Sequence, residues 1–208
     1  MLTSTLTLPH EVIVSDGGSS DRTRRTGDKK YATVVVFSAP GRQTIARRRN
    51  DGARIARGDF LTFLDADCVI PEPDRHFTRA LSHFLKNPNL VALSANLHVL
   101  PQEETFGHRL VHSVDNLGLR LKNNVFNRGE SFGEFEMIRR EALTRLGGFR
   151  ADLVTIEDAD MFRRLPTIGK NNDRLRTHGI AHRTSRPSAG MAALDLHVAR
   201  QFVFRERL

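Results

Sequence analysis

Residues 56–71 read ARGDFLTFLDADCVIP, and no other stretch says more about the architecture. Its apolar run from Asp59 to Leu64 has the length of a β-strand and leads directly into Asp65 and Asp67. Two carboxylates this close together beside a tight turn are able to share one hard cation, and Mg²⁺ or Mn²⁺ also keeps positions for substrate phosphates. The alternative is that one aspartate caps the turn while the other is solvated. Other motifs in the sequence therefore have to distinguish a cation site from a simple turn.

The rest of the chain alternates short β-branched runs with longer helical patterns, which is typical of an α/β domain. Further strands are predicted at Glu11 to Ser15, Ala32 to Phe37, Leu90 to Val99 and Glu134 to Ile138. Helices are predicted at Gln43 to Arg57, Pro73 to Leu85, Thr105 to Lys122, Arg139 to Leu146, Glu157 to Leu165 and Ser188 to Arg205, with a loop at Asn123 to Ser131. We expect a single α/β domain over residues 1–208.

The net charge indicates the class of partner, and the cysteine content indicates the compartment. The 32 Lys and Arg against 24 Asp and Glu give a net charge of +8, which suits a nucleotide, a nucleic acid or an anionic membrane surface. The single cysteine, Cys68, excludes an internal disulfide and a multi-cysteine zinc site, so a reducing cytoplasm is the expected location. No apolar run approaches the roughly 20 residues that cross a bilayer, so any membrane contact is expected to be peripheral.

A second polar segment follows the first predicted strand. Residues 11–23 read EVIVSDGGSSDRT, which places Asp16 and a glycine pair directly after a buried run. Ligands bind at this position in open α/β sheets. The Asp16 carboxylate is able to accept a hydrogen bond from a base or ribose, and the glycines, Gly18 among them, let the backbone approach a ligand. Taken alone, the segment would predict only a turn.

These motifs together resemble the family-two glycosyltransferases. EVIVSDGGSSDRT looks like the first nucleotide-binding segment of that family, and ARGDFLTFLDADCVIP looks like its strand leading into a DxD turn. Arg49, Asn50 and Gly52 match its RN-x-G pattern, while Gly133 with residues 137–140 (MIRR), 146–149 (LGGF) and 157–160 (EDAD) resemble its acceptor-side stretch. The match covers about Glu11 to Leu165. It implies a GT-A type fold, a Rossmann-like nucleotide-binding domain with a mostly parallel mixed sheet flanked by helices.

The resemblance also implies roles on the donor side. Asp16 would contact the uracil or other base, and Gly18 and Asn50 would belong to the nucleotide-sugar site. Asp65 would lie in the ribose and metal region, and Asp67 would bind the Mn²⁺ or Mg²⁺ that bridges the diphosphate. Such a metal offsets the charge that develops on the leaving diphosphate.

On the acceptor side the resemblance implies that Asp158 is the general base and that Glu157 helps to orient it. A carboxylate that takes the proton of the attacking hydroxyl supports inversion without a covalent enzyme intermediate. Capping of a helix N-terminus is the structural alternative for both acids, and the two roles are compatible. His182 resembles a late histidine that some relatives place near the metal and diphosphate, although a lone histidine is more often a surface or packing residue.

The implied activity is transfer of a sugar from a nucleotide-diphosphate sugar to a glycan, lipid-linked or small-molecule acceptor, in the biosynthesis of cell-envelope glycans. No Gln-x-x-Arg-Trp motif is present and Trp is absent, which favours a single addition over a processive synthase. The family usually has a strand and a helix before the segment matched by Glu11 to Asp21, and here only about ten residues precede it. The missing strand would lie centrally in the sheet. Either the chain is a fragment or mis-started version of a longer enzyme, or another segment or subunit covers that side.

Three other functions compete with sugar transfer. A non-catalytic remnant that binds nucleotide sugars would share every donor-side motif. A nucleotidyltransferase is disfavoured because residues 17–20 (GGSS) lack a nearby lysine, and a nucleic-acid module rests on charge alone, so no nucleic-acid partner is expected. Residues 188–208 carry Met191, Leu194, Val198 and Phe202 at helical spacing among arginines. That segment is predicted to dock on anionic lipid or, alternatively, to pack on the core.

Overall fold

A computed structural model describes residues 6–16, 33–37, 44–65, 68–70, 72–99, 104–168, 175–182 and 198–204. The strands are β1 (His10–Asp16), β2 (Val34–Phe37), β3 (Phe60–Leu64), β4 (Cys68–Val69), β5 (Ala92–Val99), β6 (Phe135–Arg139), β7 (Leu175–His182) and β8 (Val198–Phe204). The helices are α2 (Ile45–Ile55), α3 (Pro73–Lys86), α4 (Phe106–Arg120), η1 (Leu121–Val125), α5 (Arg140–Arg145), α6 (Glu157–Arg164) and η2 (Leu165–Thr167). These elements confirm the predicted α/β class.

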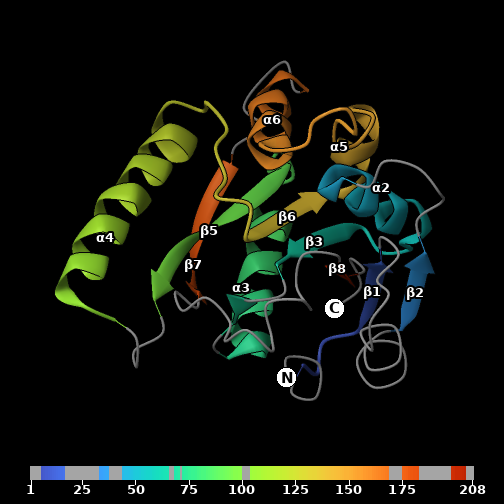
Figure 1. Ribbon diagram of the computed structural model, residues 1–208, viewed down its shortest axis with the longest axis horizontal. Helices are drawn as coiled ribbons and strands as arrows, with labels where there is room; N and C mark the ends of the chain where they lie inside the picture. Colours follow the sequence, from blue (N-terminus) through green and yellow to red (C-terminus); the bar gives the residue numbers. More distant parts are fainter. Residues whose placement is uncertain are drawn as a thin grey trace.

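One mixed sheet with the strand order β2-β1-β8-β3-β6-β5-β7-β4 runs through the middle of the protein (Figure 1). The pairings make β2, β1, β3, β5 and β7 point one way and β8, β6 and β4 the other way. Five of the eight described strands therefore share one direction, and the sheet is mixed, as predicted. Because the opposing strands lie between them, most neighbouring pairs in the described sheet are nevertheless antiparallel.

The centre of the sheet is filled by the C-terminal strand β8. It pairs antiparallel with β1 through Ile13 and Gln201, and antiparallel with β3 through Thr62 and Phe202. A later segment of the chain thus occupies the central position that the sequence leaves open. The helix predicted over residues 188–205 is wrong for residues 198–204, because two flanking strands satisfy both backbone edges of this segment, and residues 188–197 lie outside the described residues.

The core lies on both faces of the sheet because β3 is buried on both. Phe60 and Leu64 pack on the face covered by α3, and Leu61 and Phe63 pack on the opposite face under α2, α5 and α6. Alternate strand residues point to opposite faces, so five consecutive buried residues require cover on each side. Val203 and Phe204 of β8 are buried in these two clusters. Core packing of the stripe at Met191, Leu194, Val198 and Phe202 stays a prediction, because the side chains of these residues are not among the described ones.

Most predicted boundaries are close to the observed ones, and one difference matters. Helix α4 continues into a π-helical turn, η1, so the loop predicted from Asn123 begins only after Val125. Pro166 lies in the 3₁₀ turn η2 that ends α6, as expected for a residue without a backbone N–H.

Candidate active site

The end of β3 delivers the first site carboxylate. Every residue of β3 is buried, and Asp65 follows it with a side chain that is 48% exposed. The backbone N–H of Asp65 donates to the carbonyl of Glu134 at 3.1 Å, and its own carbonyl accepts from Cys68 at 3.2 Å. Hydrogen bonds therefore hold Asp65 on both sides, and its carboxylate lies at the carboxyl end of β3, as the sequence predicts.

A buried guanidinium, that of Arg49, connects this edge with the acceptor side. The side chain of Arg49 is 4% exposed and lies 3.3 Å from Asp65, 3.3 Å from Glu136 and 3.6 Å from Glu157. It also donates to the carbonyl of Gly133 at 3.2 Å. Four chain segments, α2, the end of β3, β6 with its approach, and the start of α6, thus converge on one cation.

Burial and mutual attraction set the protonation of this cluster. Burial by itself lowers the pKa of Arg49, but the neighbouring carboxylates, Glu136 first, outweigh it and raise that pKa above its ordinary value. Burial raises the pKa of Glu136 to about 8 despite the opposing attraction of Arg49. Burial also raises the pKa of Glu157. Burial and the attraction of Arg49 therefore act on the pKa of Glu136 in opposite directions, and burial dominates.

The acceptor-side acids begin α6. Ile156 precedes the helix with a φ of 61°, and Glu157 and Asp158 form its first turn, where the helix dipole favours negative charge. The Asp158 carboxylate accepts from the backbone N–H of Ala159 at 2.7 Å and lies directly against Gly133. A β-carbon at residue 133, whose φ is 87°, would collide with Oδ2 of Asp158. Gly133 thus touches Asp158 and, through its carbonyl, Arg49.

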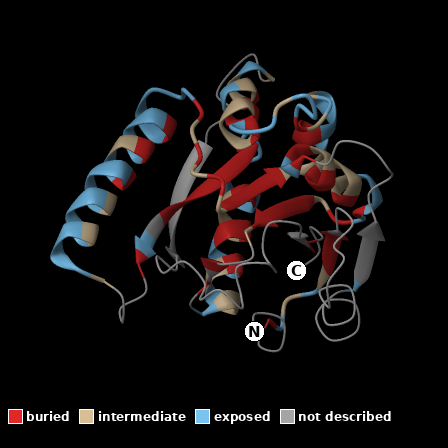
Figure 2. Cartoon of the chain, viewed as in Figure 1, coloured by how far each residue is buried: buried red, intermediate tan, exposed pale blue. Residues whose placement is uncertain are grey.

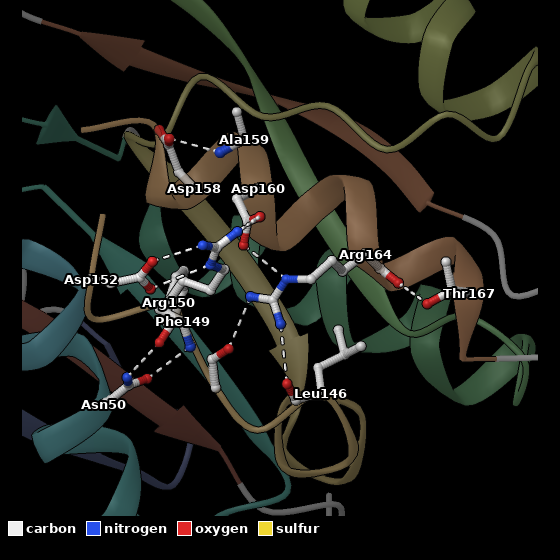
Figure 3. A network of polar contacts seen from close by, with 11 residues as sticks. Asn50, Leu146, Phe149, Arg150, Asp152, Asp158, Ala159, Asp160, Arg164 and Thr167 are labelled. Carbon is white, nitrogen blue, oxygen red and sulfur yellow. Dashed lines mark hydrogen bonds and ion pairs between the residues drawn. The ribbon is translucent and has the colours of Figure 1, made fainter. Parts of the chain in front are cut away.

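Asp160 lies on a different side of the same turn and is held in a separate network (Figure 3). Its carboxylate accepts from Nε of Arg164 at 2.8 Å and lies 3.9 Å from Arg150. Arg164 in turn donates to the carbonyls of Leu146 and Gly148. Figure 3 shows Asp158 pointing away from these arginines, and it makes no ion pair with another described residue. Of the α6 acids, Asp158 is therefore the one that no described salt bridge holds.

Asn50, predicted as a nucleotide-sugar contact, is engaged elsewhere. Its Nδ2 donates to the carbonyl of Phe149 at 2.7 Å, and its Oδ1 accepts from the N–H of Phe149 at 2.9 Å (Figure 3). A β-carbon at Gly148 would collide with Oδ1 of Asn50, so the glycine pair lets the two segments approach. The RN-x-G motif therefore ties α2 to the LGGF turn, with Arg49 directed to the carboxylates.

The structure describes the other residues predicted for the donor side only in part. Asp16 is the last residue of β1, and its side chain is not among the described ones. His182 pairs through its backbone with Cys68, so β7 runs beside the DxD turn, although the His182 side chain is likewise not described. Gly18 and Asp67 lie outside the described residues. Within the part of the chain that the structure describes, no group of three His, Cys, Asp or Glu forms a metal site.

Sequence reasoning missed two members of the cluster. Arg49 lies in a run of arginines, a pattern typical of a solvated helix face, yet Arg48 and Arg49 are both buried. Its position three residues after Ala46 and four before Ala53 places it on the small-residue face of α2, which was an available signal. Glu136 stands inside the apolar strand β6, and a carboxyl group at such a position was a second signal.

A sequence model described as glycosyl transferase family 2 matches residues 2–147. The chain belongs to this family. It is 28% identical over 193 residues to the O-antigen biosynthesis protein RfbC of Myxococcus xanthus, which covers 86% of this chain and 14% of that protein. It is 27% identical over 163 residues to an uncharacterized glycosyltransferase of Haemophilus influenzae, covering 74% of this chain and 51% of the relative. The chain thus spans about half or less of these two family members.

Solved structures of the same fold are similar as well. The mannosyltransferase PcManGT from Pyrobaculum calidifontis, in complex with GDP-Man and Mn²⁺, superposes with a TM-score of 0.59 at 21% identity, covering 86% of this chain and 48% of that one. The glucosyl-3-phosphoglycerate synthase of Mycobacterium tuberculosis, in complex with Mn²⁺, UDP-Glc and phosphoglyceric acid, gives a TM-score of 0.52 at 22% identity, covering 88% and 63%. These likenesses confirm the GT-A type fold.

Proposed function

We propose that this family-two chain transfers a sugar from a nucleotide-diphosphate sugar to an acceptor hydroxyl, with inversion at the anomeric carbon. The observation that carries the proposal is the convergence of Asp65, from the donor-side turn, and Glu157 and Asp158, from the acceptor-side helix, around Arg49. A donor bound near Asp65 and an acceptor bound near Asp158 would meet at this end of the sheet.

Asp158 is the general base in this proposal. Its carboxylate is part-buried at a helix N-terminus, and no described cation neutralises it by direct contact. It is therefore available to accept the proton of an attacking hydroxyl, whereas Asp160 is committed to Arg164 and Glu157 to Arg49. Direct attack by that hydroxyl, assisted by a base, inverts the configuration without an enzyme nucleophile.

The donor side fits a divalent cation. Asp65 offers a half-exposed carboxylate after a buried strand, and the pairing of Cys68 with His182 brings β7 to the same turn. We assign Asp65, Asp67 and His182 as the residues that would hold Mn²⁺ or Mg²⁺, and Asp16 and Gly18 to the nucleotide-sugar site, whereas the Asn50 amide is taken up by the backbone of Phe149. A bound cation would supply electrostatic stabilisation of the leaving diphosphate. The solved complexes of two fold relatives contain Mn²⁺ with GDP-Man or UDP-Glc, which supports this assignment.

The acceptor class and setting follow from the relatives and remain part of the proposal. One curated relative is an O-antigen biosynthesis protein, and another, 30% identical over 131 residues and covering 59% of this chain and 17% of that protein, is a cellulose synthase catalytic subunit of Pseudomonas fluorescens. We propose a glycan, lipid-linked or small-molecule acceptor of the cell envelope, single addition, and action in the cytoplasm or at the cytoplasmic membrane face as one domain over residues 1–208.

A thermal-shift screen tests the donor half of the proposal. Because a ligand that binds only the folded state raises apparent stability, UDP or GDP with Mn²⁺ at a hundredfold excess over Kd is expected to raise the Tm by about 5 °C or more. The shift should vanish without Mn²⁺ and in Asp67→Ala, but persist in the control Asp115→Ala, which removes an exposed carboxylate from α4. A metal-dependent shift of equal size in Asp67→Ala would contradict the assignment of the metal site.

A further inference from the structure

Helix α4 and the η1 turn after it carry an apolar stripe that faces away from the protein. The stripe consists of Phe106, Leu110, Val114, Leu117, Leu121 and Val125, at intervals of three or four residues. Residues at this spacing lie on one side of a helix. All six side chains are exposed, Phe106 by 82% and Val114 by 62%. Figure 1 shows α4 at the outer edge of the molecule, beyond β5 and β7.

The opposite side of the same helix, which packs on the protein, is the more polar one. Asn116, Leu119 and Asn123 are buried there. Asn123 donates to the carbonyl of Glu130 at 2.8 Å and accepts from its N–H at 2.7 Å. Figure 2 shows the buried residues of α4 on the side of the sheet and exposed residues along its outer side. The usual amphipathic pattern of a surface helix is therefore inverted, and packing within the described chain does not explain the stripe.

The charges beside the stripe are mainly positive. Residues 106–128 contain Arg109, Arg120, Lys122 and Arg128 against one acid, Asp115. At 100° per residue, Arg109 and Arg120 flank one border of the stripe and Lys122 the other. Long basic side chains at such borders are able to extend their charges toward phosphate headgroups while their stems cover apolar surface.

Two of these cations already have acidic neighbours. Arg109 lies 2.6 Å from Glu104, and Lys122 lies 3.1 Å from Glu130. The two cations are 68% and 51% exposed and the two acids 23% and 24% exposed. Ion pairs that are open to water on one side are weak enough to exchange for a phosphate. The net charge of +8 attracts the whole chain to an anionic surface and opposes the approach of a second copy.

We propose that the stripe of α4 and η1 docks the protein on an anionic lipid bilayer, with the helix lying in the plane of the headgroups. A projecting helix with an apolar outer side, aromatic residues at Phe106 and Phe126, and basic borders has the composition of an interfacial helix. In the part of the chain that the structure describes, no helix is long and apolar enough to span a bilayer, so the contact is peripheral. The surface differs from the terminal segment, residues 188–208, for which the sequence pattern leaves lipid contact and core packing as alternatives.

Co-sedimentation of the full chain with phosphatidylcholine vesicles, with and without phosphatidylglycerol, tests this inference. Leu110→Glu/Leu117→Glu is expected to lower partitioning onto the phosphatidylglycerol vesicles by about tenfold or more. The control Ile55→Glu/Leu85→Glu adds the same charge at apolar residues of α2 and α3 that are 37% and 44% exposed. It is expected to change partitioning by less than about twofold. Phosphatidylcholine alone should bind the parent chain weakly. None of these readouts depends on sugar transfer.

Three results would overturn the inference. One is equal loss of binding in both double variants, which would show attraction by net charge alone. Another is a parent chain that ignores phosphatidylglycerol and elutes as a dimer that Leu110→Glu/Leu117→Glu dissociates, because a second copy would then cover the stripe. The third is a monomer that ignores the vesicles and whose stripe resists carbene labelling, because residues 183–197 of the same chain would then cover it.

Discussion

Nη1 of Arg49 lies 3.3 Å from Oε2 of Glu136, with side-chain exposures of 4% and 0%. A cation and a carboxyl group so deeply buried lose their hydration, and only their mutual contact and that of neighbouring groups offset the loss. Asp65 and Glu157 complete the surroundings of the guanidinium. The cluster therefore supports both the fold and the placement of the proposed reacting groups.

Removal of the Arg49 charge is expected to destabilise the protein strongly. Arg49→Met leaves three carboxyl groups without their shared cation, and breaking a buried pair in this way costs about 3 kcal/mol or more. Arg54→Met is the matched control on the same helix, because Arg54 is 72% exposed and, among the described residues, forms its ion pair with Asp51. It should cost less than about 1 kcal/mol. Urea unfolding of both variants measures the difference, and equal losses would contradict the buried-cluster account.

The stability of the protein is expected to fall with rising pH through Glu136. Burial raises the pKa of its carboxyl from the ordinary 4.5 to about 8. Below pH 4.5 both folded and unfolded chains hold the proton, and between the two values only the unfolded chain releases it. The stabilising effect is thus fully present at low pH and is lost as the pH rises toward 8, by up to about 1.4 kcal/mol per pH unit.

Glu136→Gln isolates this contribution, because glutamine keeps an acceptor for Arg49 but does not titrate. Urea unfolding between pH 5 and 8 should show the variant gaining stability relative to the parent as the pH increases. Parallel pH profiles for parent and variant would mean that Glu136 does not hold its proton in the folded protein.

The substitution Gly133→Ala is expected to slow sugar transfer, whereas a matched glycine-to-alanine substitution of similar cost in stability is not. Gly133→Ala would collide with Oδ2 of Asp158, the movable end of a side chain, so the carboxylate would shift while the fold remains. Gly147→Ala is the control, because its φ of 75° carries a similar backbone penalty but nothing lies within 4 Å of the new carbon. Both variants should lose about 1–2 kcal/mol of stability. Sugar transfer should fall about tenfold or more only in Gly133→Ala, and equal rates in the two would argue against the placement of Asp158.

The substitution Asn50→Ala is expected to lower the stability of the protein but to leave its affinity for the donor nearly unchanged. Asn50→Ala removes both hydrogen bonds to the backbone of Phe149 and should cost about 2 kcal/mol. Calorimetric titration with a nucleoside diphosphate and Mn²⁺, well below the unfolding transition, should give a Kd within about twofold of the parent. A tenfold weaker Kd without loss of stability would instead favour direct contact between Asn50 and the donor.

Local patterns predict much of this fold because most elements carry their own signal. The apolar run before Asp65 and the periodicity of residues 73–86 each specify one element, and β3 and α3 form there. The terminal segment is different, since Val198 and Phe202 fit helical spacing as well as they fit a seven-residue strand. Only pairing with β1 and β3, which are distant in sequence, selects the strand.

Some residues of the candidate site are likewise revealed by local sequence, and others only by packing between distant segments. Acids that follow strands or begin helices, such as Asp65 and Asp158, are visible as motifs in the sequence. Arg49 gains its role only when four distant segments pack around it. Its spacing from small residues of α2 indicates a buried face, but it does not identify the carboxylates that meet the guanidinium there. The contact between Gly133 and Asp158 is equally non-local.

The central claim is that Asp158 takes the proton of the acceptor during sugar transfer. The most direct test measures incorporation of labelled sugar from UDP-Glc or GDP-Man, with Mn²⁺, by the parent and by Asp158→Asn, together with the Kd of each protein for the donor. A base that acts only when the hydroxyl attacks should leave the Kd near that of the parent while transfer falls by about 10² or more. Transfer at a comparable rate in Asp158→Asn, with a parent chain that is active, would contradict the account.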